Sequence, residues 1–128
     1  MAKKREVIRS DKAPSVLGPY SLGIQTQELI FLSGTIGVDP ESGSLVAGGV
    51  GAEARQALTN MTNVLAAAGS NMAKVVKTTV FLTDIEDYGE VNQVYAEFFS
   101  EEPPARSAVQ VGALPGGALV EIEAIAQT

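Results

Sequence analysis

The sequence predicts an α+β domain in which two helices lie on one face of a sheet of five or six strands. Three features predict this arrangement: β-branched segments toward both ends, two segments with helical spacing of apolar residues, and Gly, Pro and Asp at the connections. The expected element order is βββ(β)αβαββ. The 128 residues and the 45% hydrophobic content are typical of one compact domain, here 1–128.

The expected strands are short segments rich in Val, Ile, Leu and Thr. The first three form an N-terminal meander, and the turn-forming run Asp39-Pro40-Glu41-Ser42-Gly43 follows them. A second turn, Leu114-Pro115-Gly116-Gly117, separates the last two strands. The six segments lie at about 5–9, 20–26, 29–36, 74–82, 107–111 and 119–126.

Two helices are expected between these strands. Apolar residues recur with helical spacing from about 52 to 68, and Gly69 follows as a C-cap. The capping-box-like pattern Asp87-x-x-Glu90 begins the second helix. Its buried face is expected to carry Val91, Tyr95 and Phe98, with Asn92 at the edge of that face, where its amide could reach a cleft or remain an ordinary polar flank.

The sheet has more apolar surface than two helices can cover. The strand at 74–82 is expected to place Val76, Val80 and Leu82 on one face and Val75 and Phe81 on the other. In the last strand, Glu121 and Glu123 point away from the helices. The second face therefore requires another subunit. A symmetric homo-oligomer is expected, with Glu121 or Glu123 enclosed at an interface and sites in clefts between subunits.

The composition excludes several kinds of chemistry. The sequence contains no Cys and no His, so a thiolate nucleophile, a Ser-His pair and the usual zinc or haem sites are excluded. We therefore expect no metal. No apolar run approaches the roughly 20 residues of a membrane span, and the N-terminus has no hydrophobic stretch. A soluble, cytoplasmic protein without membrane association is expected.

The charge distribution argues against nucleic acid as a partner. Five of the nine basic residues lie in the first 12 positions, and residues 13–128 carry 4 positive against 13 negative side chains, a net charge of −9. Such an acidic body repels a phosphate backbone. The cluster Lys3-Lys4-Arg5 could be a nucleic-acid arm, although short charged termini are usually solvated. The glycine-rich run Gly48-Gly49-Val50-Gly51 matches no nucleotide-binding pattern.

Arg106 is the main candidate for binding a small anion. Two prolines, Pro103 and Pro104, stiffen the chain just before it, and a guanidinium presents a planar fork to a carboxylate. Considered alone, a single Arg is more often structural. Glu121 and Glu123 could be acid/base groups, although each alone is more often an interface ion-pair residue.

Eight separated stretches, in order, together match one family. They are Gly18-Pro19-Tyr20-Ser21, Phe31-Leu32-Ser33-Gly34, Asp39-Pro40-x-x-Gly43, Ala67-Ala68-Gly69, Val75 to Leu82, Val91-Asn92-x-Val94-Tyr95, Pro104-Ala105-Arg106-Ser107 and Val120 to Ala124. The chain thus resembles the RidA/YjgF reactive-intermediate deaminases from about Val7 to Ala126. The resemblance implies a chorismate-mutase-like α+β fold and a homotrimer with a central barrel and sites between neighbouring subunits.

The resemblance also implies an activity: hydrolysis of 2-aminoacrylate, 2-iminopropanoate and related enamines or imines, released by pyridoxal-phosphate enzymes, to 2-keto acids and ammonia. No cofactor or metal is implied. Arg106 would hold the substrate carboxylate, Glu121 would orient or deprotonate the attacking water, and the pocket would be lined by Tyr20, Ser33 and Asn92. The chain departs from many relatives at Leu22, Pro103 and Ala108, where Gln, an aromatic residue and Cys are common.

Two other functions remain open at this point. RNA cleavage or translation inhibition is also attached to the family, and the basic N-terminus leaves room for it. A protein that binds small carboxylates without turnover, or acts like a holdase, would use the same pocket or exposed apolar surface. Turnover of an imine substrate separates the leading hypothesis from both.

Overall fold

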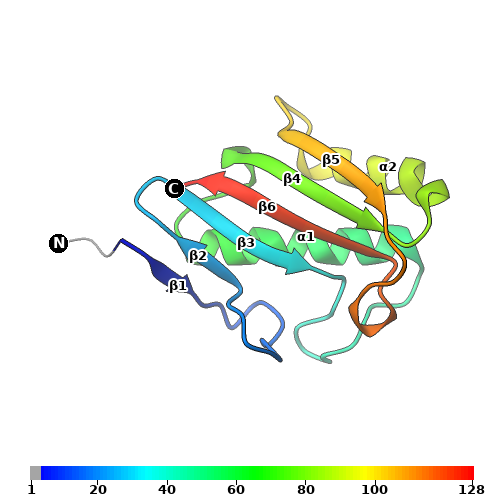
Figure 1. The fold of residues 1–128 in the computed structure, drawn as a ribbon, viewed down its shortest axis with the longest axis horizontal. Helices are drawn as coiled ribbons and strands as arrows, with labels where there is room; N and C mark the ends of the chain where they lie inside the picture. The colour runs from blue at the N-terminus through cyan, green and yellow to red at the C-terminus, as the bar shows by residue number, and fades with distance from the viewer. Residues whose placement is uncertain (1–3) are drawn as a thin grey trace.

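The computed structural model describes residues 4–128 and has the expected α+β architecture (Figure 1). Six strands form one sheet in the order β1-β2-β3-β6-β4-β5. The strands are β1 (Glu6–Ile8), β2 (Gly23–Gln25), β3 (Leu29–Thr35), β4 (Val75–Leu82), β5 (Ala105–Gln110) and β6 (Val120–Gln127). The helices are α1 (Val50–Ala67) and α2 (Tyr88–Phe98), with short 3-10 turns η1 (Met72–Lys74), η2 (Ile85–Asp87) and η3 (Pro115–Gly117).

The sheet is mixed because one pair of strands is parallel. β4 and β5 run parallel, joined by the crossover through η2 and α2, and the other neighbouring strands are antiparallel. The first three strands form the expected meander. The last strand, β6, is inserted between β3 and β4, so it lies in the centre of the sheet.

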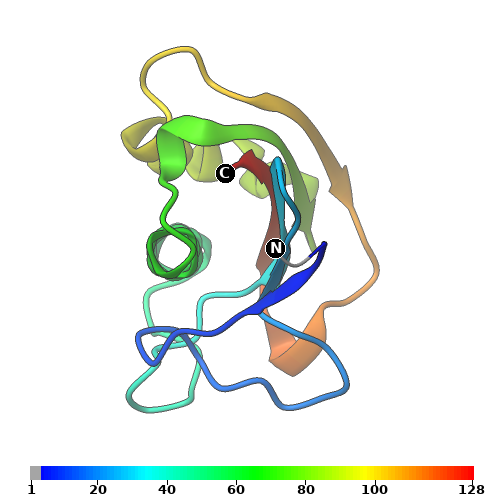
Figure 2. The ribbon, with the colours of Figure 1, turned by 90° about the vertical axis from the view of Figure 1, so that its left-hand side faces the viewer.

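Both helices lie on the same face of the sheet, as predicted. Viewed from the side, α1 is seen end-on beside the sheet, and none of the helices of residues 4–128 lies on the opposite face (Figure 2). Ile30, Leu58, Leu82 and Ile122 are fully buried between the two layers. Within residues 4–128, no helix is long and apolar enough to cross a membrane. Of the Lys3-Lys4-Arg5 cluster, Lys3 lies outside the described residues.

Helix α1 has the predicted apolar spacing and end. Ala54, Leu58, Met61 and Leu65 recur every three or four residues and are completely buried. Two residues after the helix, Gly69 adopts φ +78°, a left-handed conformation that glycine tolerates without a Cβ clash. The predicted helix at about 52–68 and its glycine stop are therefore confirmed.

The predicted capping box of α2 is wrong. Asp87 has helical dihedral angles (φ −79°, ψ −3°), and its side chain makes no capping hydrogen bond. The chain enters α2 from the turn η2, so Asp87 is not in the extended conformation that a capping residue needs. Asp84 instead accepts a hydrogen bond of 2.9 Å from the Glu86 backbone N–H at the start of η2.

The buried face of α2 also differs from the prediction. Val91 and Tyr95 are buried as expected, but Phe98 is only partly buried, whereas Val94 and Phe99 belong to the core. The reason is that α2 ends at Phe98, and the next residue turns inward from the helical spiral.

The predicted faces of Val75 and Val76 at the start of β4 are wrong, because a β-bulge exchanges them. Val75 is 5% exposed and packs in the core, whereas Val76 is 40% exposed. The pairing of β4 with β6 shifts between Val75 and Lys77, so one extra residue reverses the alternation there. Beyond the bulge, Val80 and Leu82 face the core as predicted.

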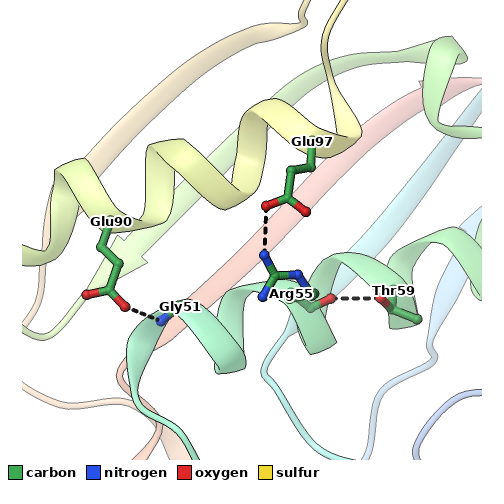
Figure 3. Close-up of polar contacts among 5 residues, drawn as sticks. All are labelled: Gly51, Arg55, Thr59, Glu90 and Glu97. Atoms are coloured by element: carbon green, nitrogen blue, oxygen red, sulfur yellow. Dashed lines mark hydrogen bonds and ion pairs between the residues drawn. The ribbon is translucent and has the colours of Figure 1, made fainter.

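Polar contacts hold α2 against α1 (Figure 3). The Glu90 carboxylate accepts a hydrogen bond of 3.1 Å from the Gly51 backbone N–H, at the positive end of the α1 dipole. Arg55 and Glu97 form a 2.7 Å ion pair, but both side chains are about half exposed (52% and 54%), so solvent weakens it. Together with the apolar contacts, these bonds fix where α2 presents its tyrosines to β5.

Candidate active site

Arg106 lies on β5 and points toward α2. It shares a face of the strand with Ala108, which packs against the core. Its Nη2 donates a hydrogen bond of 2.9 Å to the Tyr88 hydroxyl, and its guanidinium carbon lies 4.8 Å from the centre of the Tyr95 ring. Among residues 4–128 the structure has one ion pair, Arg55 with Glu97, so Arg106 is held by neutral groups. Its positive charge is available to an anion.

Tyr95 provides a fixed support beneath this guanidinium. Its hydroxyl and that of Thr78 are 2.7 Å apart, and both residues are buried. Burial raises the pKa of Tyr95 despite the opposing effects of the Thr78 hydrogen bond and the Arg106 charge. The ring is therefore neutral at physiological pH, and its face attracts the cation by about 0.5–2 kcal/mol.

Asn92 is on the same side of α2 as the two tyrosines. Tyr88, Asn92 and Tyr95 are separated by four and then three residues, which places them on one face of the helix. Asn92 is half-buried. Helical spacing thus places Asn92 on the face of α2 whose tyrosines contact Arg106.

Glu121 lies on the other face of the sheet. Its neighbours in β6, Val120 and Ile122, are completely buried toward the helices, so alternation directs Glu121 away from them, as predicted. Burial and, secondarily, the charge of Glu123 raise the pKa of Glu121. A carboxylate with a raised pKa is a better base near neutral pH than an exposed one.

Gly34 makes room for the Glu121 carboxyl group. A Cβ atom at Gly34 would lie 2.7 Å from Glu121 Cδ, closer than real contacts allow. The dihedral angles of Gly34 are not in the left-handed region, so the absence of a side chain serves this close approach. The carboxyl group therefore rests directly on the backbone of β3.

Ser33 and Tyr20 are near this second position. The Ser33 hydroxyl donates a hydrogen bond of 2.6 Å to the Ser21 carbonyl, and the Ser33 N–H donates one of 3.0 Å to the Leu22 carbonyl. Ser33 thus fixes the segment that carries Tyr20, which is 54% exposed. Tyr20, Leu22 and Gly34 line a cavity of about 400 Å³. Gly34 therefore lies next to both this cavity and the Glu121 carboxyl group.

The predicted site residues thus form two groups within one chain. The first contains Arg106 and Asn92 on the helix side, and the second contains Tyr20, Ser33 and Glu121. Arg106 pairs with Thr78, which is buried under the helices, whereas Glu121 pairs with Phe81 on the uncovered face. A carboxylate bound by Arg106 therefore cannot reach Glu121 of the same chain through the sheet.

Sequence reasoning missed three residues of these groups. Tyr88 was not singled out, Tyr95 was assigned only to the core, and Gly34 was one letter of a longer match. The spacing of Tyr88 and Tyr95 by seven residues was a usable signal, since it places both rings on one helix face. The contact of Gly34 with Glu121 depends on the pairing of β3 with β6, and local spacing does not show it.

Comparison with known proteins identifies the family. The family model described as Endoribonuclease L-PSP matches residues 10–128. The chain belongs to the endoribonuclease L-PSP family. A mouse (Mus musculus) member, named 2-iminobutanoate/2-iminopropanoate deaminase, is 53% identical over 122 residues, which are 95% of this chain and 90% of the mouse protein.

Solved structures of the endoribonuclease L-PSP family have the same fold. RidA from an Antarctic Psychrobacter species superposes with a TM-score of 0.93 at 41% identity, covering 96% of this chain and 99% of that one. E. coli TdcF with bound serine gives a TM-score of 0.91 at 40% identity, covering 96% and 98%. The predicted membership in the RidA/YjgF family and the predicted α+β fold are confirmed.

Proposed function

We propose that this chain is a hydrolytic deaminase that converts 2-iminopropanoate, 2-iminobutanoate, 2-aminoacrylate and related intermediates to 2-keto acids and ammonia. By removing these reactive compounds it would limit damage to pyridoxal-phosphate enzymes. The mouse relative named for this activity, at 53% identity over 95% of the chain, supports the proposal. The observation that carries it is the Arg106 guanidinium, held by two tyrosines and without a carboxylate partner among residues 4–128.

The chemistry requires little beyond positioning and a base. Arg106 binds the carboxylate of the imino acid through charge-assisted hydrogen bonds. Glu121 accepts a proton from water as the water oxygen bonds to the protonated imine carbon, which gives a carbinolamine. Return of that proton to the nitrogen, with loss of the hydroxyl proton to the freed Glu121 carboxylate, breaks the C–N bond and forms the C=O bond. One protonated imine and one water thus give one 2-keto acid and one ammonium ion. Tyr20, Ser33 and Asn92 shape the pocket.

We further propose that the site forms between subunits of a homotrimer whose sheets enclose a central barrel. Arg106 and Glu121 lie on opposite faces of one sheet, so the Arg106 of one subunit would meet the Glu121 of a neighbour. The exposed apolar side chains on the sheet support an interface: Phe31, Val76 and Val109 are 42%, 40% and 43% exposed. Packing of the uncovered faces would bury such residues.

The proposal includes the conditions of the reaction. The protein would act on small molecules in the cytoplasm, where imines leave pyridoxal-phosphate enzymes, and without a metal, cofactor or nucleic acid. With no Cys and no His in the sequence, carboxylate, guanidinium and hydroxyl groups carry the chemistry. The bound serine in E. coli TdcF supports a small molecule with a carboxylate as ligand.

Arg106→Ala tests the proposal. An amino-acid oxidase generates the imine, and release of the 2-keto acid is measured with and without the protein. The wild type should accelerate release, and Arg106→Ala should lose at least about 100-fold in kcat/KM, because hydrogen bonds to a charged group contribute about 1.5–3 kcal/mol each.

Arg55→Ala is the matched control, since it removes the same charge from an exposed ion pair on α1. It should retain wild-type activity. Full acceleration by Arg106→Ala would contradict the role of Arg106, and no acceleration by the wild type would contradict the proposed function.

Two alternatives have distinct outcomes in solution. The description of the family model names an endoribonuclease, so purified protein with and without residues 1–6 is incubated with RNA. The net charge of −9 over residues 13–128 predicts no cleavage by either form. A carboxylate binder without activity would bind a 2-keto acid but would not accelerate its release from the imine.

A further inference from the structure

Tyr88 has a hydroxyl group whose hydrogen-bonding capacity is only half used. It is the first residue of α2, and its side chain is 42% exposed. Arg106 Nη2 lies 2.9 Å from its oxygen. A guanidinium has only donors, so the Tyr88 oxygen accepts this hydrogen bond. The phenol proton therefore points elsewhere, and the described residues 4–128 offer it no acceptor.

Tyr95 provides the internal comparison. Its hydroxyl is buried and bonded to Thr78, and the centre of its ring lies 4.8 Å from the Arg106 guanidinium carbon. The corresponding distance to the Tyr88 ring is 5.3 Å. Tyr95 thus supports Arg106 through its ring while its hydroxyl faces the interior. Tyr88 instead presents its hydroxyl beside the guanidinium at the surface.

The Tyr88 hydroxyl and the Arg106 guanidinium are close enough to bind the same anion. The Tyr88 oxygen lies 2.9 Å from Arg106 Nη2, close enough for the phenol O–H and the guanidinium to donate hydrogen bonds to one small anion. The bond from Arg106 polarises the phenol, which strengthens its O–H as a donor. Solvent reaches both groups, since Tyr88 is exposed and Arg106 is half-buried.

We propose that Tyr88 is a second substrate-binding residue, whose O–H donates a hydrogen bond to the carboxylate that Arg106 binds. The substrate is therefore a small 2-imino acid whose carboxylate is recognised by a guanidinium–phenol pair. This inference rests on the proposed function for the identity of the substrate. It adds that carboxylate recognition needs the Tyr88 hydroxyl, whereas the Tyr88 ring alone does not suffice.

Tyr88→Phe tests the inference, because it removes the hydroxyl and keeps the ring. Butanoate and butanamide, which have the same carbon skeleton, are titrated into the full-length protein and followed by NMR. The variant should bind butanoate about tenfold more weakly, the effect of losing one hydrogen bond to a charged group, and should bind butanamide as the wild type does. In the imine assay, KM should rise about tenfold with kcat nearly constant.

Tyr95→Phe is the matched control, since it removes a hydroxyl from the same helix face that is already bonded to Thr78. It should lower the melting temperature, because it removes a buried hydrogen bond. It should weaken butanoate binding less than Tyr88→Phe does. A crystal structure with butanoate gives the direct measurement: the Tyr88 oxygen should lie within about 3 Å of a carboxylate oxygen.

The outcomes distinguish a failure of the proposed function from a failure of the role of Tyr88. If the wild type neither binds butanoate nor hydrolyses the imine, the proposed function fails and the inference fails with it. If the wild type does both and Tyr88→Phe matches it, the inference alone is overturned. A Tyr88 oxygen more than about 4 Å from bound carboxylate would also overturn it.

Discussion

The two sides of the sheet differ in whether a single chain supplies the contacts that position the polar groups. Around Arg106, the Tyr88 hydroxyl, the Tyr95 ring and Thr78 fix the guanidinium through intramolecular contacts. Around Glu121, the carboxyl group rests on Gly34, and its pKa is raised by burial and by Glu123 on a face without helices. The first region is preorganised by the fold, whereas the second requires a partner surface to become a site.

Apart from changes to Arg106 and Glu121 themselves, the largest effect is expected at Gly34. In Gly34→Ala, the new Cβ would lie 2.7 Å from Glu121 Cδ, and the carboxyl end of a flexible side chain would move to avoid it. The fold should tolerate the change, but kcat should fall about 10- to 100-fold because the base is displaced by about 1 Å.

Steady-state kinetics and a thermal melt together check this prediction. Gly112→Ala is the control, since a Cβ there meets no atom within 4 Å and Gly112 has no left-handed φ. Unchanged kcat in Gly34→Ala would show that the position of the Glu121 carboxyl group does not matter to the reaction.

A smaller effect, on stability, is expected on the Arg106 side. Tyr95→Phe removes the partner of the buried Thr78 hydroxyl, which should lower the free energy of unfolding by about 1–3 kcal/mol. Adding Thr78→Val should recover part of this loss, because no buried polar atom is then left unpaired. Urea denaturation measures both. If Tyr95→Phe leaves the free energy of unfolding unchanged, the hydrogen bond between Tyr95 and Thr78 does not stabilise the Arg106 side as the structure indicates.

The smallest effect is expected in the pH profile. The charge of Glu123 disfavours ionisation of Glu121, so Glu123→Gln should lower the pKa of Glu121. Glu121 acts as a base in its ionised form, and activity falls as pH decreases through its pKa. The acid limb of the kcat profile should therefore move to lower pH in the variant. The pKa of Glu121 should fall only part of the way to its ordinary value, because burial is the larger cause of its increase. A limb that moves to higher pH would contradict Glu121 as the base.

Local sequence patterns predicted the elements well but not how they meet. Helix α1, with its buried Leu58 and Leu65 and its terminal Gly69, followed from spacing alone. The alternation in β6 correctly placed Glu121 on the uncovered face. Spacing failed at Val75 and Val76, because a β-bulge depends on the partner strand.

The site could be predicted only in part for the same reason. Arg106 and Glu121 were candidates from their residue types and received their roles from the family resemblance. Their separation onto opposite faces depends on the insertion of β6 beside β4. Likewise, the contact of Tyr88 with Arg106 joins residues 18 positions apart on α2 and β5. Such tertiary contacts leave no periodicity in the sequence.

Mixing of two inactive variants tests most directly whether Arg106 of one subunit acts with Glu121 of a neighbour. Arg106→Ala and Glu121→Gln chains with different affinity tags are co-expressed, and mixed oligomers are purified and assayed. Each variant alone should be nearly inactive. Every mixed trimer should contain one complete site out of three and so about a third of wild-type activity, because each site needs one intact residue from each of two adjacent chains. Mixed oligomers as inactive as both parents would contradict a site shared between subunits.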